Sequence, residues 1–276
     1  MAGTAEGDGT ADEVLVWDRP ERGARGPAPE RNRGQLTEAA VRLADAGGLA
    51  AVSVRQVARE LGTGPASLYR YVAGRDDLVD LMVDAATGEI DLGVALTGDP
   101  VADLVALAGR THQVHLRHPW LVEVAPEAMR VGPRGLAYLE YALRALEPLD
   151  GLPGAAKLEA VAALNALVVM VSGAVLRARR APTARQAAQA RYLHAVAEGG
   201  EHPLLAQALA DGTTEEPGGA ALAGPGGGPR FARVVRRALT GLLAPDAPGG
   251  SGRATAAPPD TGSTAGPAPA RPGGSG

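Results

Sequence analysis

The sequence predicts an all-α protein in which an N-terminal three-helix unit precedes a larger helical domain. Apolar residues make up 45% of the 276 residues and aromatic residues only 3%, so the core must be built from aliphatic side chains and alanine. Because strands favour β-branched and aromatic residues, this composition favours packed helices. Apolar residues also recur at helical spacing along most of the chain, between recognisable start and stop signals.

Composition divides the chain into four parts. Residues 1–33 are polar and rich in Gly, Pro and Arg, which is typical of a flexible basic arm. A helix-turn-helix unit is predicted at 34–75 and a helical domain at 76–244, with a Gly/Pro linker at 211–229. Residues 245–276 contain no large apolar side chain and predict a disordered tail.

Two helices open the N-terminal unit, after a short apolar patch at 14–17 that we expect to dock on the body. In the first helix Leu36 and Ala40 begin an apolar face, and the pair Gly47–Gly48 ends it, since Gly adopts the left-handed conformation. The second helix starts at Ser53 with Gln56 three residues later, the pattern of a capping box.

The third helix begins after Gly62, which closes the second. Pro65 suits the first helical position, where its missing N–H is not needed, and Leu68 and Val72 give the helix a buried side. Two short helices joined by a tight Gly turn and braced by a third form a helix-turn-helix. The outer side of the third helix then carries Ala66, Ser67, Tyr69, Arg70 and Tyr71.

The chemistry of that outer side is suited to DNA. The small side chains of Pro65, Ala66 and Ser67 let the backbone approach base edges, where Ser can donate or accept and Ala and Pro can touch a thymine methyl. The hydroxyls of Tyr69 and Tyr71 suit phosphate oxygens. We therefore expect double-stranded DNA as a partner, although either tyrosine also fits a semi-buried packing role.

Charge is concentrated in the same region. Residues 19–75 carry ten Arg against five acids, whereas the whole chain has a net charge of −4. A basic block in an acidic protein is typical of a nucleic-acid-binding module. Arg55 and Arg75 flank the third helix and are expected to clamp the DNA backbone, with a solvated surface as the alternative. Four further arginines form an arm that either follows the duplex or is simply disordered: Arg22, Arg25, Arg31 and Arg33.

The segment from Leu36 to Met82 resembles the DNA-binding domain of the tetracycline-repressor (TetR) family. The matching pieces lie in SVRQVARELGTGPASLYRYVAGRDDLVDLMVD (53–84): a Ser-x-Arg start, the A-x-E-L-G turn, S-L-Y-x-Y-V, and a basic residue before L-x-D-L. The RHPWL sequence at 117–121 and the helices after it resemble the ligand-binding domain of the branch closest to the tetracycline repressor itself.

The resemblance implies roles for individual residues. Family members often carry Gln or a charged residue where Gly64-Pro65-Ala66 stand, so specificity here is expected to lean on Arg55, Ser67, the arm and DNA shape. By position, the resemblance implies base or phosphate contact by Arg55, base contacts by Pro65, Ala66 and Ser67, and phosphate contacts by Tyr69, Tyr71 and Arg75.

The larger half is predicted to be a ligand-binding and dimerisation domain. Residues 160–176 carry no charge and just reach the length of a membrane span, but a helix buried against its own domain and a second subunit is the stronger interpretation. This helix and the amphipathic 230–243 helix resemble the family's four-helix dimer interface. A homodimer is also required to read a palindrome. Helices are expected at 101–118, 120–129, 133–146, 155–180, 183–198 and 230–243.

Three histidines, His112, His115 and His118, are spaced three residues apart. Neighbouring pairs could share a metal, but no carboxylate stands beside them at ligand spacing, so no metal site is predicted. Tetracycline-binding relatives use a histidine in this region, which makes His112 and His115 candidates for an effector pocket. Ordinary core or surface histidines are the alternative that the pattern favours.

The sequence gives little support for catalysis. It has no Cys, no Gly-x-Ser-x-Gly or His-Glu-x-x-His motif, no cofactor motif, and no basic and apolar leader of a secretory signal. We expect a cytoplasmic repressor, not membrane-bound, released from a palindromic operator by a small amphiphilic molecule. The alternatives are the same DNA reader without a small-molecule switch or as an activator and, more remotely, a helical enzyme or scaffold.

Overall fold

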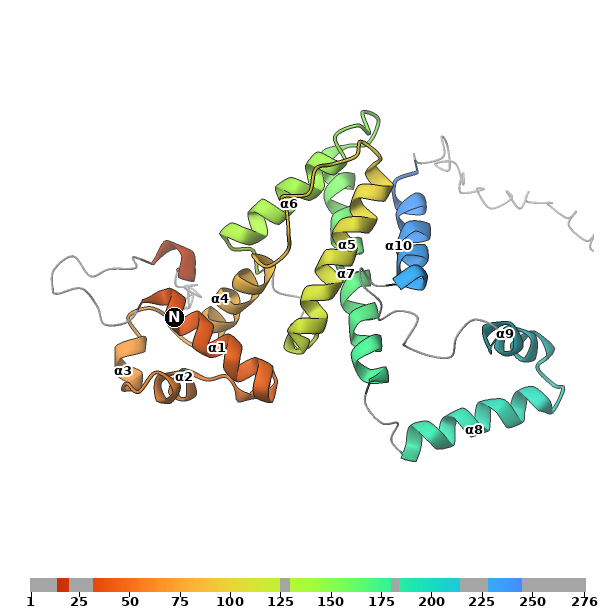
Figure 1. Ribbon diagram of the computed structural model, residues 1–276, viewed down its shortest axis with the longest axis horizontal. Helices are drawn as coiled ribbons and strands as arrows, with labels where there is room; N and C mark the ends of the chain where they lie inside the picture. The colour runs from red at the N-terminus through yellow and green to blue at the C-terminus, as the bar shows by residue number, and fades with distance from the viewer. Residues whose placement is uncertain (1–13, 20–31, 125–129, 180–183, 214–227, 245–276) are drawn as a thin grey trace, which may run out of the picture. The chain divides into compact units, whose positions relative to one another are not determined.

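The computed structural model describes residues 14–19, 32–124, 130–179, 184–213 and 228–244. Every regular element in these ranges is a helix, which confirms the predicted all-α class (Figure 1). The described residues all belong to the unit Met1–Ala244. The predicted tail, residues 245–276, lies outside the described residues.

The N-terminal helices pack around one small core. α1 contacts both α2 and α4, and α2 contacts α3. Leu36, Ala40, Val57, Leu68 and Val72 are all buried between them, as the apolar spacing predicted. The elements are η1 (Val16–Asp18), α1 (Arg33–Gly47), η2 (Leu49–Ala51), α2 (Val54–Glu60), α3 (Pro65–Leu68) and α4 (Arg75–Thr87).

The helix ends follow the start and stop signals in the sequence. Ser53 Oγ accepts from the Gln56 backbone N–H at 3.2 Å, but the Ser hydroxyl itself donates to Gln56 Oε1. In the predicted capping box, the Gln56 side chain would accept from the Ser53 backbone N–H; here it accepts from the Ser53 hydroxyl instead. Gly48 and Gly62 adopt φ values of 75° and 65°, so both stop signals are confirmed.

A complete capping box occurs where the sequence did not predict one. Asn32 Oδ1 accepts from Gln35 N at 2.8 Å, and Asn32 N donates to Gln35 Oε1 at 3.2 Å. α1 consequently begins at Arg33, which was assigned to the arm, and Arg33 Nη2 donates to the Arg19 carbonyl at 2.9 Å. Arg22, Arg25 and Arg31 lie outside the described residues.

The apolar patch at 14–17 docks on the body, as expected. Val16 is fully buried, and η1 packs against α4. Arg19 adds an ion pair with Asp77 of α4 at 3.7 Å. This segment, Val14–Arg19, is called the N-terminal strap below.

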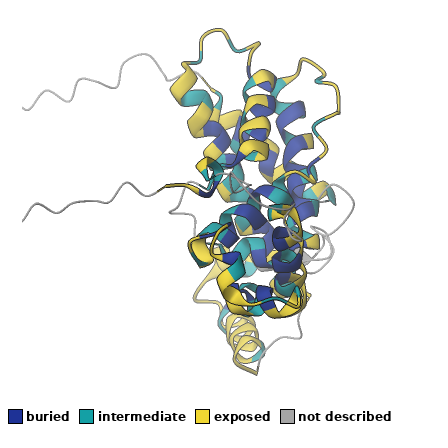
Figure 2. Cartoon of the chain, turned by 90° about the vertical axis from the view of Figure 1, so that its left-hand side faces the viewer, coloured by how far each residue is buried: buried dark blue, intermediate teal, exposed yellow. Residues whose placement is uncertain are grey.

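The larger part of the chain is built around α5, α7 and α10, which lie side by side, while α6 packs on α4, α5 and α7 (Figure 1). α8 and α9 contact each other. Along the helices, buried positions alternate with exposed ones, as amphipathic helices require (Figure 2). The elements are α5 (Pro100–Arg117), η3 (Pro119–Glu123), α6 (Pro133–Ala145), α7 (Gly154–Ala178), α8 (Ala184–Glu198), α9 (Pro203–Thr213) and α10 (Gly228–Leu242).

Two predictions about elements were wrong. The helix expected at 120–129 is only the five-residue 3₁₀ turn Pro119–Glu123 in the part that is described, and 125–129 lie outside it. The described turn ends in extended backbone at Val124, with φ −70° and ψ 127°. Pro126, two residues further along the sequence, lacks the N–H that a helix needs and disfavours helical backbone at the residue before it. The second error concerns the linker predicted at 211–229. The helix α9 was not predicted, and its last residues lie within that range.

One described helix, Gly154–Ala178, has the length and apolar composition of a membrane span. Val161, Leu164 and Val168 are buried in the core, which is how a core helix of a soluble protein also behaves. The opposite side of α7 exposes an apolar stripe at four-residue spacing, called the α7 stripe: Leu158, Ala162, Ala166, Met170 and Ala174.

Candidate nucleic-acid interface and sensor domain

The outer side of α3 presents small residues to solvent. Pro65 and Ala66 are exposed, and Tyr69 is 52% exposed. Leu68 and Val72 are buried on the opposite side, which fixes the orientation of the helix. The structure therefore brings Pro65, Ala66 and Tyr69 together on one accessible face, as the sequence predicted.

Ser67 has a more limited role than expected. Its hydroxyl donates to the Gly64 carbonyl at 2.7 Å, and its oxygen lies 2.9 Å from Thr63 Oγ1. A hydroxyl has one proton, so Thr63 must be the donor in the second contact. Ser67 is left with acceptor capacity only.

The structure corrects the prediction that Tyr71 contacts phosphate. Its ring is 2% exposed and belongs to the core, so it does not face the groove as a phosphate ligand. The Arg70 guanidinium carbon lies 4.7 Å from the centre of that ring. The sequence pattern contained the signal, because Tyr71 follows Leu68 by three residues and shares its side of the helix.

Arg55 and Arg75, the two arginines that flank α3, differ in the hydrogen bonds that they make within the protein. Arg55 is exposed near the start of α2. Arg75 is exposed as well, but its Nε donates to the Val52 carbonyl at 3.2 Å and its Nη2 to the Leu49 carbonyl at 3.0 Å. Arg75 thus braces the turn before α2 against the start of α4, and the two N–H groups of Nη1 and the second N–H of Nη2 remain for a phosphate.

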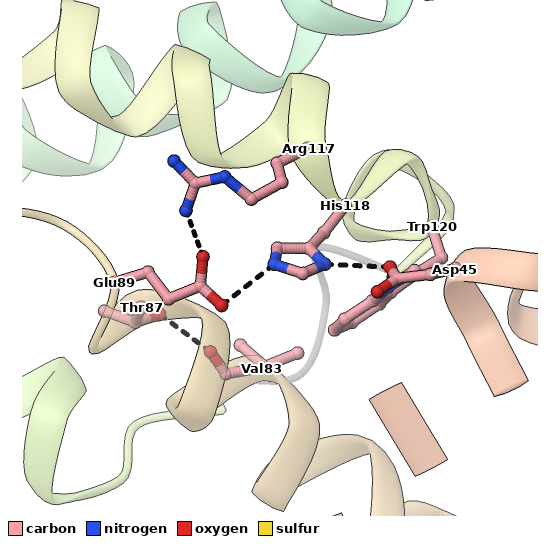
Figure 3. Close-up of polar contacts among 7 residues, drawn as sticks. All are labelled: Asp45, Val83, Thr87, Glu89, Arg117, His118 and Trp120. Atoms are coloured by element: carbon pink, nitrogen blue, oxygen red, sulfur yellow. Dashed lines mark hydrogen bonds and ion pairs between the residues drawn. The ribbon is translucent and has the colours of Figure 1, made fainter. Parts of the chain in front are cut away.

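A polar junction joins the N-terminal helices to α5 (Figure 3). The buried His118 places Nδ1 at 2.8 Å from Asp45 Oδ1 and Nε2 at 3.0 Å from Glu89 Oε1. Trp120 Nε1 donates to the same Asp45 oxygen at 2.8 Å, and Arg117 pairs with Glu89. Carboxylates only accept, so both contacts of the ring are satisfied when each nitrogen carries a proton.

Glu89 is adapted to this junction. Burial opposes its charge, but hydrogen bonds from Arg117 and His118 outweigh burial and hold the pKa of Glu89 below its ordinary value. The junction therefore links α1, the end of α4 and the end of α5 through charged groups. The local pattern around His118 predicts only a metal ligand or an ordinary histidine, because the partners of its ring lie 73 and 29 residues away in the sequence.

A second contact joins α4 to α6. The buried carboxylate of Asp84 accepts from the backbone N–H groups of Arg134 at 2.9 Å and Gly135 at 3.0 Å, at the positive N-terminus of α6. Gly132 stands beside it without room for a side chain: a Cβ there would lie 2.5 Å from Asp84 Oδ1 and 2.5 Å from Trp17 Cζ2. The N-terminal strap, α4 and α6 therefore meet at Gly132.

The larger part of the chain contains buried polar groups between its helices. His112 is fully buried, with Nδ1 at 2.7 Å from Ser172 Oγ and its ring stacked on Phe231 at 4.7 Å. These contacts tie α5 to α7 and α10. Tyr138 OH donates to Asn165 Oδ1 at 2.6 Å, and burial raises the pKa of Tyr138 to about 12.

His115 lies beside this cluster. Its Nδ1 is buried and has no hydrogen-bond partner among the described residues. Burial, and then the neighbouring His112, lowers the pKa of His115 to about 4, so the ring is neutral at physiological pH. A surface groove of about 380 Å³ lies elsewhere, lined by Leu96, Gly98, Asp103, Arg144, Ala145, Glu147, Pro148 and Asp150, and contains neither His112 nor His115. Within the described ranges, no three potential metal ligands gather in one place.

Comparison with known proteins identifies the family. Residues 36–82 match the model of bacterial regulatory proteins of the tetR family, and residues 96–220 match the tetracyclin repressor-like C-terminal domain. The HTH-type transcriptional repressor DrrR1 of Streptomyces coeruleorubidus is 37% identical over 221 residues, which cover 76% of this chain and 78% of DrrR1. The chain belongs to the TetR family.

Solved TetR-family structures support the fold. ActR of Streptomyces coelicolor without ligand matches with a TM-score of 0.63 at 24% identity, covering 79% of this chain and 97% of ActR. ActR in complex with actinorhodin matches with a TM-score of 0.60 at 24% identity, covering 78% and 97%. The predicted family and its two-part helical architecture are confirmed, and DNA-binding transcription regulation is the function of this TetR-family chain.

The lowered pKa of His115 predicts a pH dependence of folding. Its pKa is about 4 in the folded chain and ordinarily 6.5, so the unfolded chain binds more protons between these values. Stability should fall as the pH drops through that window, by roughly 3 kcal/mol in all, and be recovered above it. Urea unfolding from pH 4 to pH 7.5 should show a flatter profile for His115→Gln than for the unmodified chain. Parallel profiles would contradict the assignment.

Proposed function

We propose that this TetR-family chain is a cytoplasmic, homodimeric repressor that a small molecule releases from a palindromic operator. The observation that carries the proposal is the accessible face of α3, which is connected through α4 and the His118 junction to the buried cluster on α5. The similarity to the repressor DrrR1 supports repression over activation. No membrane attachment and no catalytic step are part of this proposal.

DNA contact is assigned to the residues that the fold leaves accessible. Pro65 and Ala66 touch base edges, and Ser67 accepts a hydrogen bond from a base. Tyr69 and Arg55 bind the backbone on either side, since both are exposed and end in groups that suit phosphate. Arg75 contributes through the N–H groups that its contacts with Val52 and Leu49 leave available.

Dimerisation is assigned to the α7 stripe together with α10. Leu158 and Met170 are 47% and 62% exposed, although α7 is otherwise a core helix. α10 packs on α7 and continues the surface with the exposed Val234 and Leu242. Two copies related by a two-fold axis would place their α3 helices in successive major grooves, about 34–36 Å apart.

The effector site is assigned to the cluster around His112 and His115. The unpartnered Nδ1 of His115 is a buried polar atom that a ligand can satisfy, and such atoms are rare in folded proteins. Both histidines lie on α5, and His118 follows directly after the last residue of that helix. A ligand that binds better when α5 has shifted changes the junction with Asp45, and a tenfold preference for that form is worth about 1.4 kcal/mol.

The test is operator binding and its release. Fluorescence anisotropy on the DNA upstream of the protein's own gene, at two salt concentrations, should show salt-sensitive binding that survives excess random DNA. Arg55→Ala should weaken it by about tenfold or more, whereas Arg144→Ala, an exposed arginine on α6, should not. Actinorhodin, which ActR binds, is the first effector probe. Failure to bind any duplex would overturn the proposal.

The close packing around His112 favours one alternative, a regulator that no small molecule controls. Phe231 stacks directly on His112, so the cluster holds no open chamber between these rings. A regulator with the same DNA reader but no small-molecule switch would have such a core. Operator release by an aromatic probe supports the switch; a panel of such probes without effect, on protein that binds its operator, supports the alternative.

A further inference from the structure

Arg70 is exposed in the turn that follows α3. The chain continues in helical form beyond α3, because the N–H groups of Tyr71 and Val72 both donate to the Leu68 carbonyl, at 2.9 and 3.2 Å. Arg70 therefore follows Ala66 by one helical turn and shares its side. Leu68 and Val72 are buried on the other side, so Ala66 and Arg70 form the outermost ridge.

The residues around this ridge provide few hydrogen-bond donors for a base. Pro65 and Ala66 have no polar side-chain atom, and the single proton of Ser67 is held by the Gly64 carbonyl. These three residues cannot donate to the two acceptors of a guanine edge, O6 and N7, and the hydroxyl of Tyr69 on the same face carries a single proton. The guanidinium of Arg70 supplies the missing donors.

The guanidinium is also held in place. It lies over the ring of Tyr71, at 4.7 Å from its centre, and that ring is fixed because it is 2% exposed. Stacking occupies the flat face of a guanidinium and leaves its N–H edges available. No ion pair in the described part of the chain involves Arg70, whereas Arg42 pairs with Glu60 and Arg130 with Asp80.

We propose that Arg70 reads a guanine in each half-site through two hydrogen bonds to O6 and N7, with the ring of Tyr71 as its support. The inference rests on the operator binding proposed above. A base edge suits Arg70 better than a phosphate because Arg70 lies on the outermost ridge with Ala66. Arg55 and Arg75 lie at the starts of the flanking helices α2 and α4, which suits them to the DNA backbone.

The experiment uses the full chain and duplexes selected from a random pool, which reveal the operator wherever it lies. Affinities are then measured for every single base-pair substitution in one half-site. The unmodified protein should lose about tenfold or more when one particular G·C pair is replaced. Arg70→Ala should lose that preference and keep the others. Arg70→Lys should lose it too, since an ammonium retains the charge but lacks the fork.

Tyr71 variants test the support. Tyr71→Phe keeps the ring and should keep the guanine preference, whereas Tyr71→Leu should lose most of it. Circular dichroism and thermal unfolding confirm that each variant is folded, and Arg144→Ala serves as the control for loss of a surface arginine. If Tyr71→Leu is unfolded, the comparison of Arg70→Ala with Arg70→Lys still decides the role of Arg70.

Two results would overturn the inference while operator binding stands. One is an Arg70→Ala protein with an unchanged preference at every position. The other is a uniform loss across all sequences with a smaller salt dependence, which is the signature of a phosphate contact. If the unmodified protein selects no duplex at all, operator binding itself fails, and the role of Arg70 fails with it. The unmodified protein and the variants thus test the two proposals separately.

Discussion

Ala166→Glu is expected to convert the protein into a monomer and to weaken operator binding by roughly 100-fold or more. Ala166 lies in the middle of the α7 stripe, where it is exposed in a single chain. In the proposed dimer a glutamate there would be buried without a partner, and burying an unpaired charge costs several kcal/mol. A monomer has one α3 and reads only one half-site. Sedimentation velocity and anisotropy on the selected operator measure the two effects.

The matched control is Ala137→Glu, which adds the same charge at an exposed alanine of α6. This variant should remain a dimer and bind as the unmodified protein does. A dimeric Ala166→Glu protein with full affinity would show that α7 is not the interface. A monomeric one with full affinity would show that operator binding does not need two copies.

His118→Ala is expected to lower the free energy of unfolding by about 2 kcal/mol, because it leaves Asp45 and Glu89 without their shared donor. Both carboxylates are partly exposed, which limits the loss. In a protein that already carries Asp45→Asn, His118→Ala should lower the free energy of unfolding by a smaller amount. The difference between the two losses measures the interaction across the junction directly.

Urea unfolding followed by tryptophan fluorescence suits this experiment, since Trp120 Nε1 donates to Asp45 at the junction and Trp17, the other tryptophan, packs beside Gly132 in the same folded body. His194→Ala, at an exposed histidine of α8, is the control and should leave stability unchanged. Equal losses with and without Asp45→Asn would contradict a direct interaction. Where operator release by a probe has been found, His118→Ala should also release less readily, because the link from α5 to α1 is weakened.

The parts of the fold that local signals determine were predictable. Gly48 and Gly62 end helices because they can adopt positive φ, and Ser53 begins one because its oxygen caps a free N–H. Each of these depends on residues within one helical turn. For the same reason Pro65, Ala66 and Tyr69 were correctly placed on an accessible face.

The parts that depend on distant residues were not predictable in this way. Asp45 and His118 are separated by 73 residues, and nothing in either local pattern indicates the other. Tyr71 was misjudged because a tyrosine is compatible with both a core and a surface, and only packing decides between them. The 120–129 helix was wrong because Pro126 lies inside that range, where a proline lacks the N–H that a helix needs and disfavours helical backbone at the residue before it.

The N-terminal strap also changes what counts as the DNA-reading module. Val16 is buried against the rest of the chain, and Trp17 closes the space beside Gly132 at the meeting of α4 and α6. A protein shortened to begin at residue 32 would retain every helix of the helix-turn-helix but lose part of the surface that supports α4. The module that reads DNA therefore includes the N-terminal strap as well as the helix-turn-helix. A protein expressed from the boundaries of the helix-turn-helix alone would lack the strap.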